Sequence, residues 1–178
     1  MIKVRLVPFL TTIAVTAALL FGGWYAYDQA VVERPLQSAV DSLPGVVSAV
    51  PTLSKDSLTV RLKLGAGADL RGIHDQIADR SAKWLEGRKL VITVDQSSQP
   101  KLDSIWTSQL FTVAEAMENR RYSEIPDALK EIERATPGLK TATSIDDSNV
   151  YVTLELGSDT KYIILPRTGE RMGVWSNA

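Results

Sequence analysis

Few side chains in this sequence have the types and spacing that acid–base or metal chemistry requires. His74 is the only histidine, and the chain has no cysteine. A metal site would therefore lack thiolates and a second imidazole, and carboxylates would have to supply its other ligands. We interpret His74 as a structural residue on a predicted helix, and we expect the chain to hold no metal.

Asp146 and Asp147 form an adjacent carboxylate pair that could bind calcium or make a turn. An EF-hand loop needs oxygen ligands at alternating positions, a central glycine and a terminal glutamate. This segment lacks the glycine and the spacing. Aspartate and asparagine are favoured in tight turns because their side chains hydrogen-bond to nearby backbone, so the pattern favours a turn over a calcium loop.

No other motif forms a catalytic constellation. The segment Gly65-Ala66-Gly67-Ala68-Asp69 lies between a predicted strand and a predicted helix, but Leu70 stands where a dinucleotide fingerprint has its third glycine. The sequence contains no G-x-S-x-G elbow, and one histidine is too little on which to build a triad. We therefore expect no enzyme, no catalytic residues and no cofactor.

An uncharged apolar stretch covers residues 6–27. About 20 apolar helical residues, at about 1.5 Å each, cross a bilayer core of about 30 Å. The stretch predicts a transmembrane anchor with aromatic rings at its far interface. The predicted anchor residues are Leu6, Phe9, Ile13, Leu19, Phe21, Trp24 and Tyr27.

Charges flanking this stretch predict its orientation. Lys3 and Arg5 precede it, whereas Asp28 and Glu33 follow it. The positive-inside rule therefore makes residues 1–5 a cytoplasmic stub and places the bulk of the chain outside the cell membrane. The alternative is a cleaved signal peptide, but both candidate cleavage sites have a poor residue at the position three before the cut. We expect a retained single-pass anchor.

Composition limits the function of the remaining chain. The 178 residues carry a net charge of −1, and 44% of them are hydrophobic. Such a chain can form a packed core. Lysine and arginine form no basic stripe, so we expect no nucleic-acid binding.

An internal repeat organises the exported part. Residues 36–65 and 129–157 share a Pro-Gly pair, at Pro44 and Pro137, followed by a strongly alternating run that ends at a glycine. Each copy predicts a short helix that stops at Pro-Gly, then two strands joined by a polar turn. The first strand is predicted at about 46–53 in one copy and 139–145 in the other. In the second strand of the first copy, alternation places Leu58, Val60, Leu62 and Leu64 on one apolar face.

The predicted fold class is α+β: the N-terminal transmembrane helix precedes two small modules of helices on antiparallel or mixed sheets. Residues 35–95 form an αββαβ module in which a helix joins parallel strands at 58–64 and 90–94. Residues 101–175 form an ααβββ(β) module with a helical hairpin, and its last strand lies at 170–175. Three aromatic residues are a candidate ligand or partner surface between the hairpin and the second sheet: Trp106, Tyr122 and Tyr151.

The first module, with Pro44-Gly45-Val46, the alternating strand from Leu58, and Val91-Ile92-Thr93-Val94-Asp95, resembles small αββαβ domains of the bacterial envelope. It is similar to sporulation lipoproteins of the YhcN/YlaJ type and to the ring-building motifs of secretion systems and sporulation channels. The lipid-modified cysteine of those lipoproteins is absent, so a membrane helix would replace the lipid. The resemblance implies no catalytic residues.

These observations predict a single-pass bacterial envelope protein, with a sporulation role implied by the resemblance. Its two extracytoplasmic modules would assemble with themselves or with membrane or wall proteins, through sheet edges and polar strand faces. The expected partners are the lipid bilayer and a protein partner or second copy. The alternatives are a membrane-tethered ligand-binding sensor and a wall-active enzyme.

Overall fold

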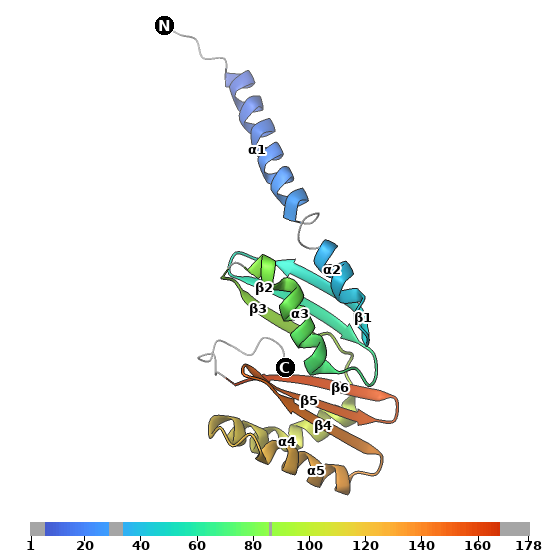
Figure 1. Ribbon diagram of the computed structural model, residues 1–178. Coiled ribbons are helices and arrows are strands. Elements are labelled where there is room, and N and C mark those ends of the chain that lie inside the picture. Colours follow the sequence, from blue (N-terminus) through green and yellow to red (C-terminus); the bar gives the residue numbers. More distant parts are fainter. Residues whose placement is uncertain (1–5, 29–33, 86, 168–178) are drawn as a thin grey trace.

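The computed structural model describes residues 6–28, 34–85 and 87–167, and within the first helix it describes side chains from 11 to 23. The described residues form five helices and two three-stranded sheets (Figure 1). The α+β prediction is confirmed. Residues 1–5, the predicted strand at 170–175 and the anchor side chains of Leu6, Phe9, Trp24 and Tyr27 lie outside what is described.

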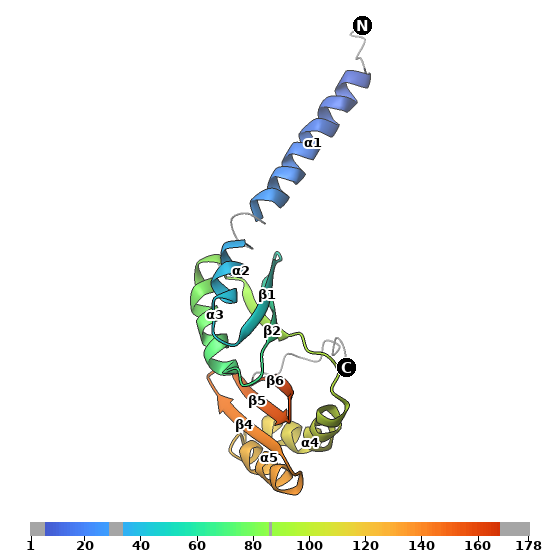
Figure 2. The same ribbon diagram turned by 90° about the vertical axis from the view of Figure 1, so that its right-hand side faces the viewer.

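Helix α1 (Leu6–Asp28) forms where the apolar stretch predicted a helix, and it lies away from both modules (Figures 1 and 2). The side chains of Ile13, Leu19 and Phe21 are exposed. In the part of the chain that the structure describes, however, no helix combines the length and the apolar character needed to cross a membrane. The predicted membrane span is therefore unsupported.

The first module has the predicted order helix, strand, strand, helix, strand: α2 (Arg34–Asp41), β1 (Val46–Leu53), β2 (Ser57–Leu64), α3 (Leu70–Leu85) and β3 (Lys89–Val94). Strand β2 pairs antiparallel with β1 and parallel with β3, as the helical crossover predicts. Figure 2 shows α2 and α3 on one side of this sheet. Alternation puts Leu58, Val60 and Leu62 of β2 into the core beneath them.

The second module begins with a helical hairpin, α4 (Pro100–Glu118) and α5 (Glu124–Ala135). It continues with an antiparallel sheet of β4 (Leu139–Ile145), β5 (Asn149–Leu156) and β6 (Asp159–Pro166). The hairpin covers one face of that sheet (Figure 1). Its apolar stripe, including Leu102, Val113 and Leu129, packs against Val152 and Leu154.

The repeat extends to a hydrogen bond that the sequence pattern did not indicate. The carboxylate of Asp41, at the end of α2, accepts the backbone amide of Ala49 in β1 at 2.7 Å. The carboxylate of Glu133, near the end of α5, accepts the amide of Thr141 in β4 at 3.1 Å. Each acid lies eight residues before the amide it caps. In both copies a helical acid therefore binds an outward-facing amide of the first strand.

The two modules meet through a small core of Leu70, Tyr151 and Tyr162. The hydroxyl of Tyr162 donates to the carbonyl of Gly65 at 2.5 Å and accepts the amide of Ala68 at 3.0 Å. The side chain of Gln96 accepts the amide of Tyr162 at 3.0 Å and donates to its carbonyl at 2.9 Å. The second sheet is thus covered by helices on one face and by the first module on the other.

We predict that Tyr162→Phe destabilises the folded protein by about 1–3 kcal/mol, because a part-buried carbonyl and amide each lose their partner. Urea unfolding followed by tyrosine or tryptophan fluorescence measures the change. Tyr122→Phe is the matched control, since the Tyr122 ring packs on the second core and against the Arg167 guanidinium at 4.7 Å, and neither contact uses the hydroxyl. Equal stability of the Tyr162→Phe and Tyr122→Phe proteins would contradict the prediction.

Candidate functional site

The three aromatic residues predicted as one ligand surface lie on different sides of the second sheet. Trp106 and Tyr122 pack against the core beneath the helical hairpin. Tyr151 lies on the opposite face, in the small core between the modules. The structure therefore does not bring them together around one pocket. The sequence pattern could not separate them, because alternation along β5 assigns Tyr151 to a face without saying what covers that face.

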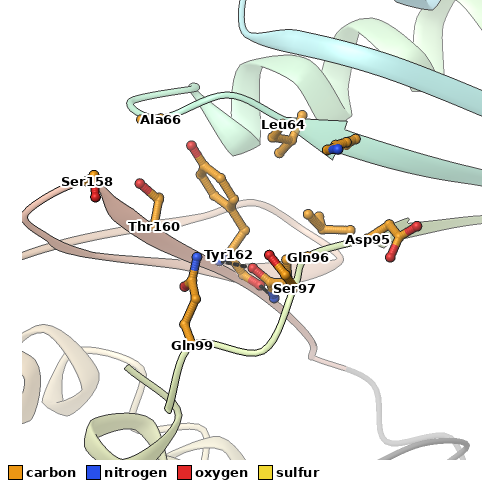
Figure 3. A pocket seen from close by; sticks show the side chains of 11 residues that line it. Leu64, Ala66, Asp95, Gln96, Ser97, Gln99, Ser158, Thr160 and Tyr162 are labelled. Atoms are coloured by element: carbon orange, nitrogen blue, oxygen red, sulfur yellow. Dashed lines mark hydrogen bonds between the residues drawn. The ribbon is translucent and has the colours of Figure 1, made fainter. Parts of the chain in front are cut away.

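A small cavity lies at the junction of the modules (Figure 3). It has a volume of about 150 Å³ and is lined by residues of β2, β3, the inter-module connection and β6, among them Leu64, Gln96, Gln99 and Tyr162. A second cavity of about 270 Å³ lies beside Tyr151 and Thr153. The first cavity is well below the roughly 300–1,000 Å³ typical of small-molecule sites, and the second lies near the lower end of that range.

The other face of the junction gathers polar side chains from both modules. His74 of α3 faces Asp146 in the turn between β4 and β5, with Nδ1 4.0 Å from Oδ2. The neighbouring Asp75 places Oδ1 3.9 Å from the same nitrogen. The hydroxyl of Tyr151 donates to Oδ2 of Asp146 at 2.5 Å, and the edge of the His74 ring lies against the Tyr151 ring.

The turn predicted around Asp146 is confirmed. Oδ1 of Asp146 accepts the amides of Ser148 and Asn149 at 2.6 Å each, which is the local bonding that favours aspartate in turns. The side chain of Asp147 is exposed. Sequence reasoning placed His74 and Asp146 in separate modules, and it had no signal that folding would bring them within 4.0 Å of each other.

Burial and hydrogen bonding shift the titration of this cluster. Burial lowers the pKa of His74 and outweighs the opposing effect of the carboxylates of Asp146 and Asp75. Burial by itself would raise the pKa of Asp146, but the hydrogen bonds from Tyr151, Asn149 and Ser148 hold it below its usual value. Burial, followed by the bond to Asp146, raises the pKa of Tyr151. Near neutral pH a neutral His74 imidazole thus faces the Asp146 carboxylate.

Sheet edges are the other candidate sites, and three of the four edge strands carry a cap from a side chain. Asp41 caps β1 and Glu133 caps β4, as described above. Gln96 bonds both backbone groups of Tyr162 on the outer side of β6, as Figure 3 shows. Pro51 removes a further donor from β1. Each of these devices occupies or removes backbone groups to which an added strand would bond, and so disfavours its addition.

Strand β3 is the remaining edge. The amides of Lys89 and Asp95 donate to carbonyls of Asp56 and Leu62 on the β2 side. Since bonding alternates along a strand, the backbone groups of Leu90, Ile92 and Val94 face outward. Among the described residues, β3 pairs only with β2.

Comparison of the chain with protein-family models, curated proteins and solved structures found no match.

We predict that the free energy of unfolding falls when the pH is lowered through the range in which His74 takes up a proton. The folded state holds the pKa of His74 below its ordinary value of 6.5, so the unfolded chain binds more protons in this window. The stability due to neutral His74 is complete above pH 6.5 and is lost as the pH falls through the lowered pKa. Urea unfolding at about pH 7.5 and about pH 5.5 measures the loss.

His74→Gln should flatten this pH dependence. Asp103 and Asp146 do not contribute to the pH dependence between about pH 5.5 and about pH 7.5. Hydrogen bonds hold the pKa values of both carboxyl groups below the usual range. An equal pH dependence in the His74→Gln protein would assign the effect to other groups.

Proposed function

We propose that this chain is a non-enzymatic assembly protein of the bacterial envelope, which pairs with a second copy of itself through β3 while α1 holds it at a membrane. The observation that carries the proposal is the pattern of edge capping among the described residues: Asp41, Glu133 and Gln96 bind backbone groups on the outer edges of β1, β4 and β6, whereas β3 pairs only with β2. An open edge adds strands through main-chain hydrogen bonds.

The sequence of β3 complements itself. If two copies pair antiparallel about Ile92, Leu90 lies opposite Val94 of the second copy, and the outward backbone groups of both strands meet in register. Lys89 then lies opposite Asp95 at each end of the paired segment, so that unlike charges face each other. Such a contact is isologous, and a two-fold axis closes it without further growth.

The resulting sheet would have six strands in the order β1-β2-β3-β3-β2-β1. A two-fold axis perpendicular to the sheet keeps α2 and α3 of both copies on one face, so neither apolar core is disturbed. The edges of this larger sheet would be the two β1 strands, which Asp41 and Pro51 already blunt. The capping pattern therefore favours a dimer over an open-ended assembly.

Helix α1 supports attachment to a membrane. Its described side chains include Ile13, Val15, Leu19, Leu20 and Phe21, which are 50% to 78% exposed. Exposed apolar side chains gathered on one helix mark a surface that contacts lipid or protein. The sequence orientation, with its basic residues before the helix and acidic residues after it, places both modules outside the cytoplasm in this proposal. The sporulation role rests on the resemblance of the first module.

The non-enzymatic part of the proposal rests on the sequence. A single histidine and the absence of cysteine leave few groups for nucleophilic or acid–base catalysis. A ligand-binding sensor is the alternative, and the second junction cavity, of about 270 Å³, would hold only a small ligand.

Charge reversal at the ends of β3 tests the pairing. We predict that full-length protein in mild detergent is dimeric. Lys89→Glu or Asp95→Lys should weaken the dimer about 5- to 30-fold, because each variant places two like charges opposite each other at both ends of the paired strands. The double variant Lys89→Glu/Asp95→Lys restores unlike pairs and should recover the affinity. Sedimentation velocity over a range of concentrations measures the dissociation constant.

Lys140→Glu is the matched control, because Lys140 is an exposed residue of β4, whose edge Glu133 caps. It should leave the dimer unchanged. A protein that is monomeric throughout, or a double variant no stronger than the single ones, would rule out this dimer.

Attachment through α1 is tested by fractionation. We predict that the full chain sediments with membranes after alkaline carbonate washing, and that Leu19→Lys with Phe21→Lys moves most of it to the supernatant, because charged side chains are costly in lipid. Phe111→Lys is the control, since Phe111 is an equally exposed apolar residue on α4. Equal release of both variants would contradict attachment by α1.

A further inference from the structure

We propose that His74, Asp75 and Asp146 bind a zinc ion that links the two modules. His74 and Asp75 belong to α3 of the first module, and Asp146 belongs to the second. One ligand atom from each residue lies within 4.8 Å of the others. This site is separate from the β3 edge, so it does not depend on the proposed dimer.

The distances leave room for an ion and exclude a direct hydrogen bond. Nδ1 of His74 lies 3.9 Å from the Asp75 carboxylate and 4.0 Å from that of Asp146. A hydrogen bond would need about 2.7–3.2 Å. Zinc bonds of about 2.0–2.2 Å draw two ligand atoms to roughly 3.3 Å of each other in a tetrahedral site. The separations of the ligand atoms, all within 4.8 Å, would need to shorten by about 1.5 Å or less, shared between the ligands.

The buried nitrogen has no satisfactory partner within the described residues. Nδ1 of His74 is fully covered and makes no hydrogen bond there. If it carries the proton, the proton has no acceptor in range; if it is bare, its lone pair faces two carboxylates. Either arrangement leaves a buried polar atom unsatisfied, which is costly. A cation bound between the nitrogen and the two carboxylates resolves both problems.

Neighbouring groups hold the ligands in place. The amides of Ser148 and Asn149 fix one oxygen of Asp146, and the hydroxyl of Tyr151 donates to the other at 2.5 Å. The side-chain nitrogen of Asn149 lies 3.4 Å from Nε2 of His74 and donates to the Tyr151 hydroxyl at 3.3 Å. Metal binding at Nδ1 requires this amide to turn over, so that its oxygen accepts the Nε2 proton and Nδ1 is left bare for the metal. Hydrogen bonds of this kind orient ligands in metal sites.

The ligand chemistry favours zinc over calcium and magnesium. An imidazole nitrogen suits zinc and related transition metals, whereas calcium and magnesium prefer oxygen-only sites. Three protein ligands leave a fourth position for water in a tetrahedral site. Because the ligands come from both modules, the ion would stabilise the junction that Tyr162 also holds.

The test titrates zinc into metal-free, full-length protein at about pH 7.5, where His74 is neutral. Isothermal titration calorimetry should find one ion per chain. Thermal unfolding should shift upward by about 5–10 °C at 100 times the dissociation constant. Asp75→Asn and His74→Gln should each weaken binding at least about 10-fold. Calcium should give little shift.

Asp147→Asn is the matched control, because Asp147 is an exposed carboxylate beside Asp146 that lies outside the cluster. It should bind zinc as the unchanged protein does. The side chain of Asp75 is about half exposed, so Asp75→Asn tests the site without disturbing the core if His74→Gln fails to fold. The absence of saturable zinc binding, or equal affinity in the Asp75→Asn and Asp147→Asn proteins, would overturn the proposal.

Discussion

Burial of Tyr162 between the modules is the contact on which the remaining arrangement depends. Its ring packs with Leu70 and Tyr151, its hydroxyl bonds the loop that precedes α3, and its backbone bonds Gln96. The contact therefore covers the second face of the β4-β5-β6 sheet and caps β6. It also brings the start of α3 against the β4–β5 turn, where His74 meets Asp146.

Hydrogen-bond satisfaction also distinguishes the edge strands of the two sheets from one another. Unpaired backbone groups on a strand edge invite a further strand, and natural sheets block them. Both copies of the repeat block their first strand with an acid from the preceding helix. The copies differ in how they end: a helical crossover makes β3 parallel to β2, whereas a tight turn makes β6 antiparallel to β5. Gln96 of the inter-module connection caps β6, whereas β3 pairs only with β2 among the residues that the structure describes.

The local elements were largely predictable because periodicity encodes them. The strands predicted at 46–53 and 139–145 have those bounds in the structure, and the one predicted at 58–64 begins one residue earlier, at Ser57. Alternation also assigned Leu58, Val60 and Leu62 to a buried face. The apolar stretch at the N-terminus predicted a helix correctly, but the described residues do not support a membrane span.

What the sequence determined by itself is the set of helices and strands, their order and which side chains share a face, because these follow from neighbours within a few residues. Only the tertiary structure decided what each face meets. It separated Tyr151 from Trp106 and Tyr122, and it placed His74 beside Asp146. Contacts of this kind depend on how two finished modules pack, and no periodicity along the chain encodes that packing.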